Sequence, residues 1–457
     1  MKISFATFAL PLLMLSSCML GPDYKGPQDS GLPVTWVNAL PPGTDAYTLT
    51  RWWQSFNDPQ LTGLIESAFA ANPDMITAAL SISKAESALR STQSGLFPSA
   101  GVNFGGTNSG SFSTSTSHGR WSGGLSASWT PDIWGGTRRQ VEAAFANLGS
   151  TKAAASATRA ALASGIAVAY FDWISARESL RIAREQLEYQ ERTYNITAKR
   201  HGVGMQSSLD LAEARATIAS TRAQIPALEA NIRKCENTLA TYLGTTVDRV
   251  KLYMPGSRVY NLIPRVPTGL PSDLLRRRPD IIRAERDLHA ATANIGVNVA
   301  NLFPRLSLTG STSSSSGSDF ANFFQSTGWS LGASASQTLL NRVSLNESVK
   351  QAEIQQKAAM QSYRKTVLAA FAEVETCLID YARLTNQLPQ YAASCAANKE
   401  AARLSLERYN AGEGEFLNVA ASERAWLAAE LNLITSRQQI RMTLARLCTA
   451  LGGGWEK

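Results

Sequence analysis

The chain contains two copies of one sequence pattern, and this duplication limits its fold more than any other feature. Residues 72–74 match residues 278–280, and residues 96–98 match residues 302–304, with the same separation of 206 positions. A constant separation over so long a stretch indicates internal duplication rather than chance. After a shift of two residues the separation of 208 positions continues without a gap and joins Trp121 to Trp329, Val141 to Val349, Arg200 to Arg408, Gly204 to Gly412, and Leu209 to Leu417.

Each repeat contains the same expected elements in the same order. Residues 61–243 form the first repeat and residues 271–451 the second, with a linker at 244–270 and a tail at 452–457. A helix leads into a Gly- and Ser-rich segment with two strand patterns, and a long helix, a Gly-containing turn and another helix follow. The expected spans are 61–94, 100–130 and a turn at 201–208 in the first repeat, and 271–301, 305–338 and a turn at 409–416 in the second.

The long helices favour coiled-coil packing. The first is expected over Arg138–Arg200, which is about 94 Å at ~1.5 Å per residue. A helix of that length needs neighbours along its whole length rather than a place in one globular core. A plain helical bundle would show the same periodicity. In the second repeat, a heptad seam with alternating spacings of three and four consists of Val367, Phe371, Val374, Leu378, Tyr381, Leu384 and Leu388.

The strand patterns separate a membrane protein from a plain bundle. Residues 121–129 and 329–336 alternate large or apolar residues with Ser and Gly, and Trp121, Trp129 and Trp329 stand at their ends. Alternation of this kind over about nine residues is typical of a strand with one face to lipid and one to a lumen. The expected partner strands are 101–108 and 305–311, joined to the first two by polar loops at 109–119 and 312–325.

Two hairpins per chain predict an oligomer. Four strands do not close a barrel, and open strand edges are not tolerated in lipid. Several copies must therefore share one barrel. Three copies supply twelve strands, enough for a water-filled lumen, although physics alone allows two to four.

The N-terminus predicts a lipid anchor. Lys2 and the short apolar run Phe5–Leu15 are typical of a signal peptide, here residues 1–17. Residues 15–18 read Leu-Ser-Ser-Cys, which indicates cleavage before an acylated Cys18. An ordinary signal peptide with an incidental cysteine is the alternative. Met19 follows, so nothing indicates retention in the inner membrane, and the mature chain is expected at the outer membrane of a Gram-negative cell.

Composition excludes several classes of function. The longest Ala-rich run, Ala153–Tyr170, contains Arg159, and no stretch of eighteen apolar residues follows the signal peptide. The net charge of +8 is spread along helical segments, which favours solvated helix faces over a nucleic-acid site. His118, His201 and His289 are scattered, and no phosphate-binding loop is present, so we expect neither an enzyme nor a cofactor or metal site.

Four cysteines follow Cys18, and two of them form a candidate disulfide. In an antiparallel hairpin that turns between positions 412 and 413, Cys377 and Cys448 face each other. The periplasm is oxidising, which permits a bond. Cysteines in helices are more often small apolar side chains, so free thiols are the alternative.

Three further motifs resemble the TolC-like outer membrane factor family, in particular its lipoprotein, NodT-type branch. The first is Cys18-x-x-Gly-Pro-Asp-Tyr24, and the second is Trp52-Trp-x-x-Phe-x-Asp-Pro-x-Leu61. The third is Leu274-Leu-x-Arg-Arg-Pro-Asp-Ile281, whose proline is typical of the first turn of a helix. The resemblance covers nearly the whole mature chain.

The resemblance implies both architecture and partners. It implies a homotrimer with a twelve-stranded transmembrane barrel, continuous with a twelve-helix periplasmic tunnel, and a belt formed by segments such as residues 18–60. It also implies a periplasmic adaptor protein and an inner-membrane transporter of the resistance-nodulation-division type. The expected function is then the exit duct of a multidrug efflux pump in the outer membrane, connected with antibiotic resistance.

The two helix-hairpin turns resemble the family's periplasmic tips, where the adaptor docks and an iris-like gate closes. Gly204 and Gly412 fit left-handed positions that end a helix, and Ser208 is expected to cap the next helix. In the family a tyrosine pairs with an aspartate of a neighbouring coil, which corresponds here to Tyr409 and Asp210. A solvated Asp210 and a packed Tyr409 are the alternative.

The second tip departs from the family pattern. Gly414 stands where well-known members carry an arginine of the lock, beside Arg408, and Asn418 and Ala421 replace two aspartates that ring the pore. An acidic constriction would then depend on Glu413 and Glu415. Each chain of the trimer would contribute one copy of both residues, and this ring of negative charge would favour the passage of cations. Both glutamates facing the adaptor is the alternative.

Two other functions remain open at this stage. The first is a conduit of the same fold that serves type I protein secretion. The second is a lipid-anchored coiled-coil scaffold without a pore, which the alternating strands with their terminal tryptophans argue against.

Overall fold

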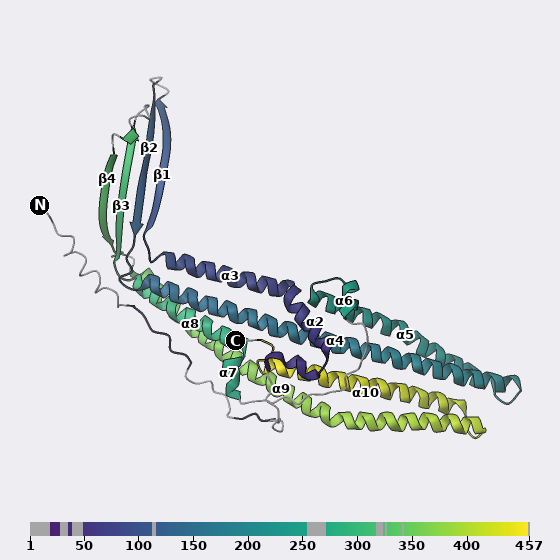
Figure 1. The fold of residues 1–457 in the computed structure, drawn as a ribbon. Helices are drawn as coiled ribbons and strands as arrows, with labels where there is room; N and C mark the ends of the chain where they lie inside the picture. The colour runs from purple at the N-terminus through teal and green to yellow at the C-terminus, as the bar shows by residue number, and fades with distance from the viewer. Residues whose placement is uncertain are drawn as a thin grey trace. The chain divides into compact units, whose positions relative to one another are not determined.

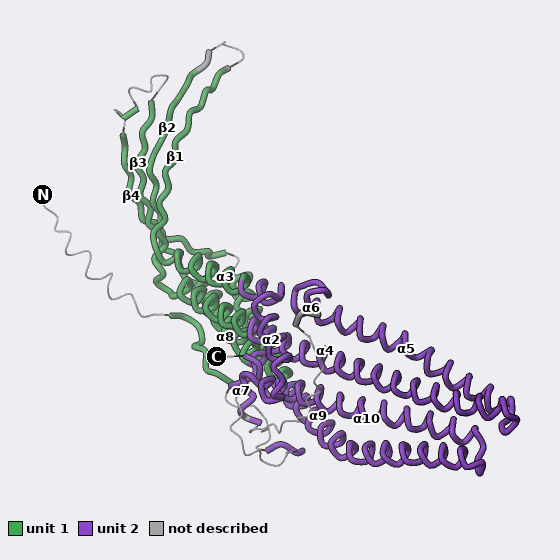
Figure 2. The backbone as a smooth tube through the Cα atoms, turned by 45° about the vertical axis from the view of Figure 1, so that its right-hand side comes forward, with its two compact units in different colours: residues 1–30, 80–153, 282–366 green, residues 31–79, 154–281, 367–457 purple. Residues whose placement is uncertain are grey.

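The computed structural model of the chain describes residues 19–27, 35–38, 49–111, 116–253, 271–316, 323–324, 327–340 and 342–455. The predicted signal peptide, Cys18 and most of the linker 244–270 lie outside these residues. The chain divides into two compact units (Figure 2). Unit 1 comprises residues 1–30, 80–153 and 282–366, and unit 2 comprises residues 31–79, 154–281 and 367–457. Each unit therefore combines parts of both repeats.

Unit 1 contains one antiparallel sheet of four strands in the order β1-β2-β3-β4 (Figure 1). The strands are β1 (Ser99–Ser111), β2 (Thr116–Trp129), β3 (Arg305–Ser316) and β4 (Thr327–Ser336). The central pair, β2 with β3, joins the two repeats from Trp121↔Ser316 to Trp129↔Leu308. The strands β1, β2 and β3 extend into the predicted loops 109–119 and 312–325. The Ser and Gly residues there had suggested turns, but they continue the backbone pairing of the strands.

The register gives the sheet two unlike faces. Val102 pairs with Leu125, Thr312 with Trp329, and so on across the sheet, so the large apolar side chains share one face. Many of them are exposed in the single chain. The members of this apolar face are Val102, Phe104, Trp121, Leu125, Trp129, Leu306, Leu308, Trp329 and Leu331. The opposite face carries small polar residues that include Asn103, Ser122, Ser126, Ser307, Ser311 and Ser330.

The rest of the described chain is mainly helical, and the long helices predicted from the sequence are present. None of the described helices combines the length and the apolar character needed to cross a membrane. The heptad seam is largely buried, including Val367, Val374, Leu378 and Leu384. The elements are η2 (Leu49–Phe56), α2 (Pro59–Ala71), α3 (Pro73–Ser94), α4 (Gly136–Gly202), α5 (Ser208–Leu243), α6 (Val247–Tyr253), η3 (Pro271–Asp273), α7 (Leu274–Arg277), α8 (Pro279–Ala300), α9 (Arg342–Ala411) and α10 (Phe416–Ala450).

The single helices predicted over 61–94 and 271–301 are wrong, because each is broken before a proline. Asn72, before Pro73, has ψ 129°, and Arg278, before Pro279, has ψ 121°. A residue that precedes proline is driven from the helical region by the proline ring. Asn72 then helps to start α3, since its Oδ1 accepts from Asp74 N at 2.8 Å.

In unit 2, the tryptophan-rich motif forms a buried core beside α4. Trp52, Trp53 and Phe56 of η2 are almost fully buried. Asp58 is the N-cap of α2, and its Oδ1 accepts a hydrogen bond from Gln60 N at 2.9 Å. Its other oxygen accepts from the Tyr170 hydroxyl of α4 at 2.8 Å. The aspartate of this motif therefore caps a helix and fixes it to α4.

Candidate functional site

The two helix-hairpin tips repeat one turn geometry. Gly204 and Gly412 have φ +77° and +84°, as predicted for left-handed residues at helix ends. Met205 N donates to Arg200 O at 2.9 Å, and the duplicate bond joins Glu413 N to Arg408 O at 3.0 Å. The prediction that Ser208 caps α5 is wrong by one residue. Ser207 is the cap, and its hydroxyl accepts from Asp210 N at 3.2 Å.

Tyr409 is the centre of a buried apolar cluster at the tips, which we call the tip cluster. Its ring lies 5.4 Å from that of Phe416 in an edge-on arrangement. Its hydroxyl contacts Thr197 Oγ1 at 3.3 Å. Burial is the main cause that raises the pKa of Tyr409. The tip cluster consists of Ala214, Tyr409, Phe416, Val419 and Ala420, with Tyr194 and Leu406 packed against it.

Within one chain the Tyr409 hydroxyl is thus bonded to Thr197 of α4. Asp210, in the first turn of α5, is half-buried and close enough for its charge to contribute a further upward shift to the pKa of Tyr409. The pairing of Tyr409 with an aspartate of a neighbouring coil stays a prediction about the assembly.

Arg200 joins the two tips and was not singled out from the sequence. Its Nη1 donates to Tyr409 O at 3.2 Å and its Nη2 to Asn410 O at 2.6 Å. Basic side chains are favoured at the ends of helices, where backbone carbonyls lack partners. The position of Arg200 near the end of a predicted helix suggested a bond to backbone carbonyls. It did not show that these carbonyls belong to α9 rather than to α4.

The remaining predicted gate residues are solvent-exposed at the second tip. Arg408, Glu413, Gly414, Glu415 and Asn418 all lie on or beside the turn between α9 and α10. Glu415 directly precedes α10 and makes no capping bond with its side chain. The exposure of Glu413 and Glu415 is compatible with both alternatives, an acidic ring at the pore and a surface that faces the adaptor.

A buried polar contact between α4 and α10 was missed by the sequence analysis. Glu423 is only 1 % exposed, and burial raises its pKa to about 7. Gln186, Gln190 and Thr193 of α4 are buried as well. Polar residues in an exposed-looking helix pattern are normally solvated, so periodicity gave no indication that these would be buried.

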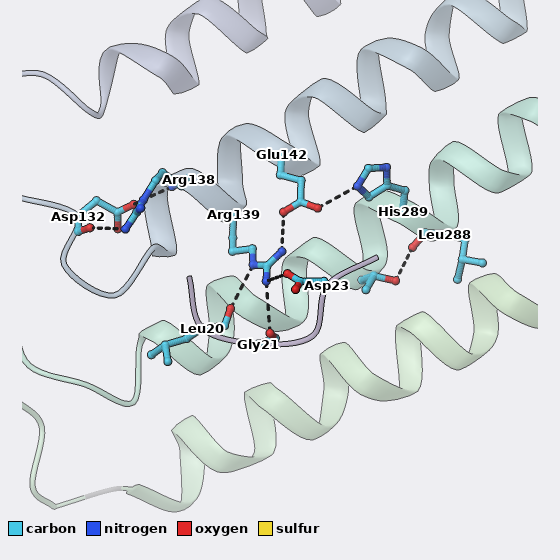
Figure 3. A network of polar contacts seen from close by, with 10 residues as sticks. Leu20, Gly21, Asp23, Asp132, Arg138, Arg139, Glu142, Leu288 and His289 are labelled. Atoms are coloured by element: carbon cyan, nitrogen blue, oxygen red, sulfur yellow. Dashed lines mark hydrogen bonds and ion pairs between the residues drawn. The ribbon is translucent and has the colours of Figure 1, made fainter. Parts of the chain in front are cut away.

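In unit 1, Arg139 holds the N-terminal segment 19–24 against α4 (Figure 3). Its guanidinium is 2 % exposed and donates to Leu20 O at 3.1 Å and Gly21 O at 3.3 Å. It also forms ion pairs with Asp23 and Glu142, both at 2.7 Å. The Gly-Pro-Asp-Tyr signature therefore has a structural role, because its residues accept hydrogen bonds and an ion pair from a buried arginine.

His289 of α8 extends this network. One ring nitrogen lies 2.9 Å from Glu142 Oε1, and the Tyr24 ring stacks on the imidazole with centroids 4.2 Å apart. Gly21 approaches α8 so closely that an added Cβ would lie 2.5 Å from the Cα of Gly296. We call residues 19–24 with Arg139, Glu142 and His289 the N-terminal clasp.

The Arg-Arg-Pro-Asp motif opens α8 as predicted, and Pro279 is the first residue of that helix. Arg278 pairs with Asp280 and Glu373 and donates to Ala450 O at 2.8 Å. These contacts tie the start of α8 to α9 and α10 within unit 2. The motif is thus structural.

Cys377 and Cys448 are both free thiols in the structure, so the candidate disulfide is not formed. Cys448 is fully buried and behaves as a small apolar side chain, which was the stated alternative. Over the parts of the chain that the structure describes, no three His, Cys, Asp or Glu residues group as metal ligands would.

The outer membrane efflux protein family model matches residues 64–245 and, a second time, residues 270–453. The two matches follow the two repeats. The chain belongs to the outer membrane efflux protein family. The predicted resemblance to TolC-like, NodT-type proteins is therefore confirmed, and this efflux protein is placed in the outer membrane.

Relatives match this outer membrane efflux protein along nearly its whole length. The pyoverdine export outer membrane protein OpmQ of Pseudomonas aeruginosa is 31% identical over 459 residues, which cover 97% of this chain and 95% of the relative. Nodulation protein T of Rhizobium leguminosarum bv. viciae is 32% identical over 454 residues, with 98% and 93% covered.

A solved structure of the outer-membrane channel OprN shares the fold. It is 28% identical, with a TM-score of 0.87, and the match covers 96% of this chain and 100% of that one. The predicted fold class is confirmed: this efflux protein has the fold of the trimeric outer-membrane channels, with four strands contributed by each chain.

Proposed function

We propose that this protein is the exit duct of a tripartite efflux system and conducts drugs or other small toxic compounds passively out of the cell. The observation that carries this proposal is the sheet with one apolar and one polar face, whose edges in a single chain are β1 and β4. In an outer-membrane protein the apolar face meets lipid, and the polar face lines a wet lumen. Three chains close the edges into twelve strands, because unpaired strand edges are costly in lipid.

The periplasmic partners belong to the same proposal. An adaptor docks at the tips around Gly204, Ser208, Gly412 and Gly414, and couples the duct to a transporter of the resistance-nodulation-division type. The support is family membership and the exposure of both turns. The export role named for the Pseudomonas aeruginosa relative agrees with small-molecule efflux. Energy for transport comes from the transporter.

The tips also serve as an iris-like gate. The tip cluster and the Arg200 bonds hold the ends of α4, α9 and α10 together in each chain. Pairing of Tyr409 with Asp210 of a neighbouring coil locks the closed state, and opening requires this packing to loosen. The resemblance of both turns to the family's periplasmic tips supports a position of the gate at the periplasmic end.

Acylation of Cys18 anchors the mature chain in the membrane. The support is the Leu-Ser-Ser-Cys motif and the N-terminal clasp, which holds the residues directly after Cys18 on a folded surface. Mass analysis of the mature N-terminus should find a diacylglyceryl-modified cysteine, and Cys18→Ser should prevent this modification. An unmodified mature chain would refute the anchor.

Efflux is tested in cells from which this protein has been deleted. Such cells should accumulate a fluorescent pump substrate, and wild-type protein supplied in trans should restore its extrusion. Co-purification after in vivo cross-linking at exposed positions of the tips should recover the adaptor. Unchanged accumulation of small compounds, together with lost secretion of a protein, would favour the type I secretion conduit instead.

A further inference from the structure

The contact of α4 with α10 contains a polar stripe between two apolar clusters. The tip cluster lies on one side, and Ile182, Leu427 and Ile434 form an apolar cluster on the other. Between them the ring of Tyr189 packs edge-on against Trp426 at 5.8 Å. The polar stripe consists of the buried residues Gln186, Gln190, Thr193 and Glu423.

Several polar atoms of the stripe have no hydrogen-bond partner among the residues that the structure describes. They are both polar atoms of the Gln190 side chain, Nε2 of Gln186 and Oε1 of Glu423. Burial of a polar atom without a hydrogen-bond partner is unfavourable. The stripe therefore resists separation of α4 from α10 less than the apolar clusters do, and entry of water would satisfy its polar atoms.

No cation compensates Glu423 within the described part of the chain. Burial raises the pKa of Tyr189 on α4, and the charges of Glu423 and of Glu407 on α9 raise it further, so Tyr189 lies close to both carboxyl groups. Glu407 is itself paired with Arg403. Lys399 of α9 lies over the Trp426 ring at 5.6 Å, and its charge acts on Glu430. An ionised Glu423 would thus be buried without a paired charge.

Hydrogen bonding from Thr193 acts against burial, because it lowers the pKa of Glu423, although by less than burial raises it. Thr193 is the hydrogen-bonding neighbour of Glu423, and its Oγ1 lies 3.1 Å from Tyr189 O. The hydroxyl has one proton and cannot donate to both acceptors. An ionised Glu423 therefore competes with Tyr189 O for this proton, so the bond from Thr193 compensates the buried charge only in part.

We propose that Glu423 is a proton-controlled latch of the gate: the protonated side chain holds α10 against α4, and loss of the proton favours their separation and an open tip. This inference rests on the proposed function, in which the tips form the gate. Burial raises the pKa of Glu423 in the packed state, and hydration returns it toward its ordinary value on separation. Packing is therefore favoured fully below the ordinary value and is lost as pH rises toward about 7.

The test is the conductance of purified trimers in planar bilayers at about pH 5.5 and about pH 8. The open fraction of wild-type protein should rise with pH on the order of tenfold, because burial raises the carboxyl pKa of Glu423 to about 7 only in the packed state. Glu423→Gln, which stays neutral, should remove most of this rise. The control Glu430→Gln, two turns further along α10 and only half-buried, should retain it.

The outcomes separate this inference from the proposed function. Glu413→Gln with Glu415→Gln must also retain the rise, since otherwise the exposed acidic tip and not Glu423 is the titrating group. A conducting wild type without pH dependence, or Glu423→Gln with unchanged pH dependence, overturns the latch alone. Trimers that conduct at neither pH overturn the proposed channel. Glu423→Met is a second neutral variant if Glu423→Gln does not assemble.

Discussion

Gly412 and Gly414 stand two residues apart in the second tip but place different demands on a side chain. Gly412 has φ +84°, where a residue with a Cβ is strained. The backbone of Gly414 lies outside that region, and an added Cβ would be 3.6 Å from Tyr409 N, an ordinary contact. Only one of the two glycines is therefore required by the backbone, and Gly414, where the resemblance predicted an arginine, has room for a side chain.

Gly412→Ala should destabilise the second tip by ~1–2 kcal/mol, the cost of a left-handed backbone for an L-residue. Gly414→Ala, the matched control, should leave its stability within ~0.5 kcal/mol. Hydrogen exchange over residues 405–420 of the purified trimer measures both effects. Equal protection in the two variants would contradict the assignment of strain to Gly412.

Glu413 and Glu415 place two exposed negative charges on the second tip of each chain. If three copies of each glutamate surround the mouth of the pore, Glu413→Gln with Glu415→Gln should lower the preference for cations over anions. Reversal potentials in a salt gradient across a planar bilayer report this preference. An unchanged preference would remove both residues from the gate and leave them to the adaptor surface.

In the N-terminal clasp, one buried side chain, Arg139, makes four of the polar contacts that hold residues 19–24 and Glu142 together. Arg139→Ala removes its bonds to Leu20 O and Gly21 O and both ion pairs at once. Charge-assisted hydrogen bonds contribute ~1.5–3 kcal/mol each, so trypsin should cut after the exposed Lys25 at least about tenfold faster. Arg139→Lys keeps the charge and should be intermediate. A cleavage rate equal to that of wild type would show that the segment is held elsewhere.

The pairing of β2 with β3 joins the strands of the two repeats into one sheet. An added Cβ at Gly124 would lie 2.2 Å from the backbone oxygen of Thr312, whereas Gly105 faces open space. Gly124→Ala should therefore disturb strand pairing and lower the yield of folded trimer, and Gly105→Ala should not. Protease protection and oligomeric mass in detergent measure the yield. Normal assembly of Gly124→Ala would contradict the close approach.

Long, strongly periodic elements could be predicted from the sequence, and contacts between distant residues could not. The heptad seam and the duplication determined the helical hairpins and the two strand pairs. The breaks at Asn72 and Arg278 were missed because apolar periodicity continues across each proline. The clasp was missed because no periodic pattern relates Asp23 to Arg139. Glu423 was missed because a glutamate on a helix is normally solvated.

At the scale of the whole molecule, the single chain is incomplete. The apolar face of the sheet is exposed in one copy, and β1 and β4 are its edges. The small polar residues of the other face suit a lumen rather than a packed core. These features require neighbouring copies, which agrees with the fold of the trimeric channels.

The central claim is that three chains form a passive pore that the tips close. The most direct test is the conductance of the purified protein in planar bilayers, with the oligomeric mass determined on the same sample. We expect trimers with small conductance steps that grow when Tyr409→Phe removes the hydroxyl of the lock. Large steps in the wild type would contradict the lock, and folded trimers that never conduct would contradict the pore.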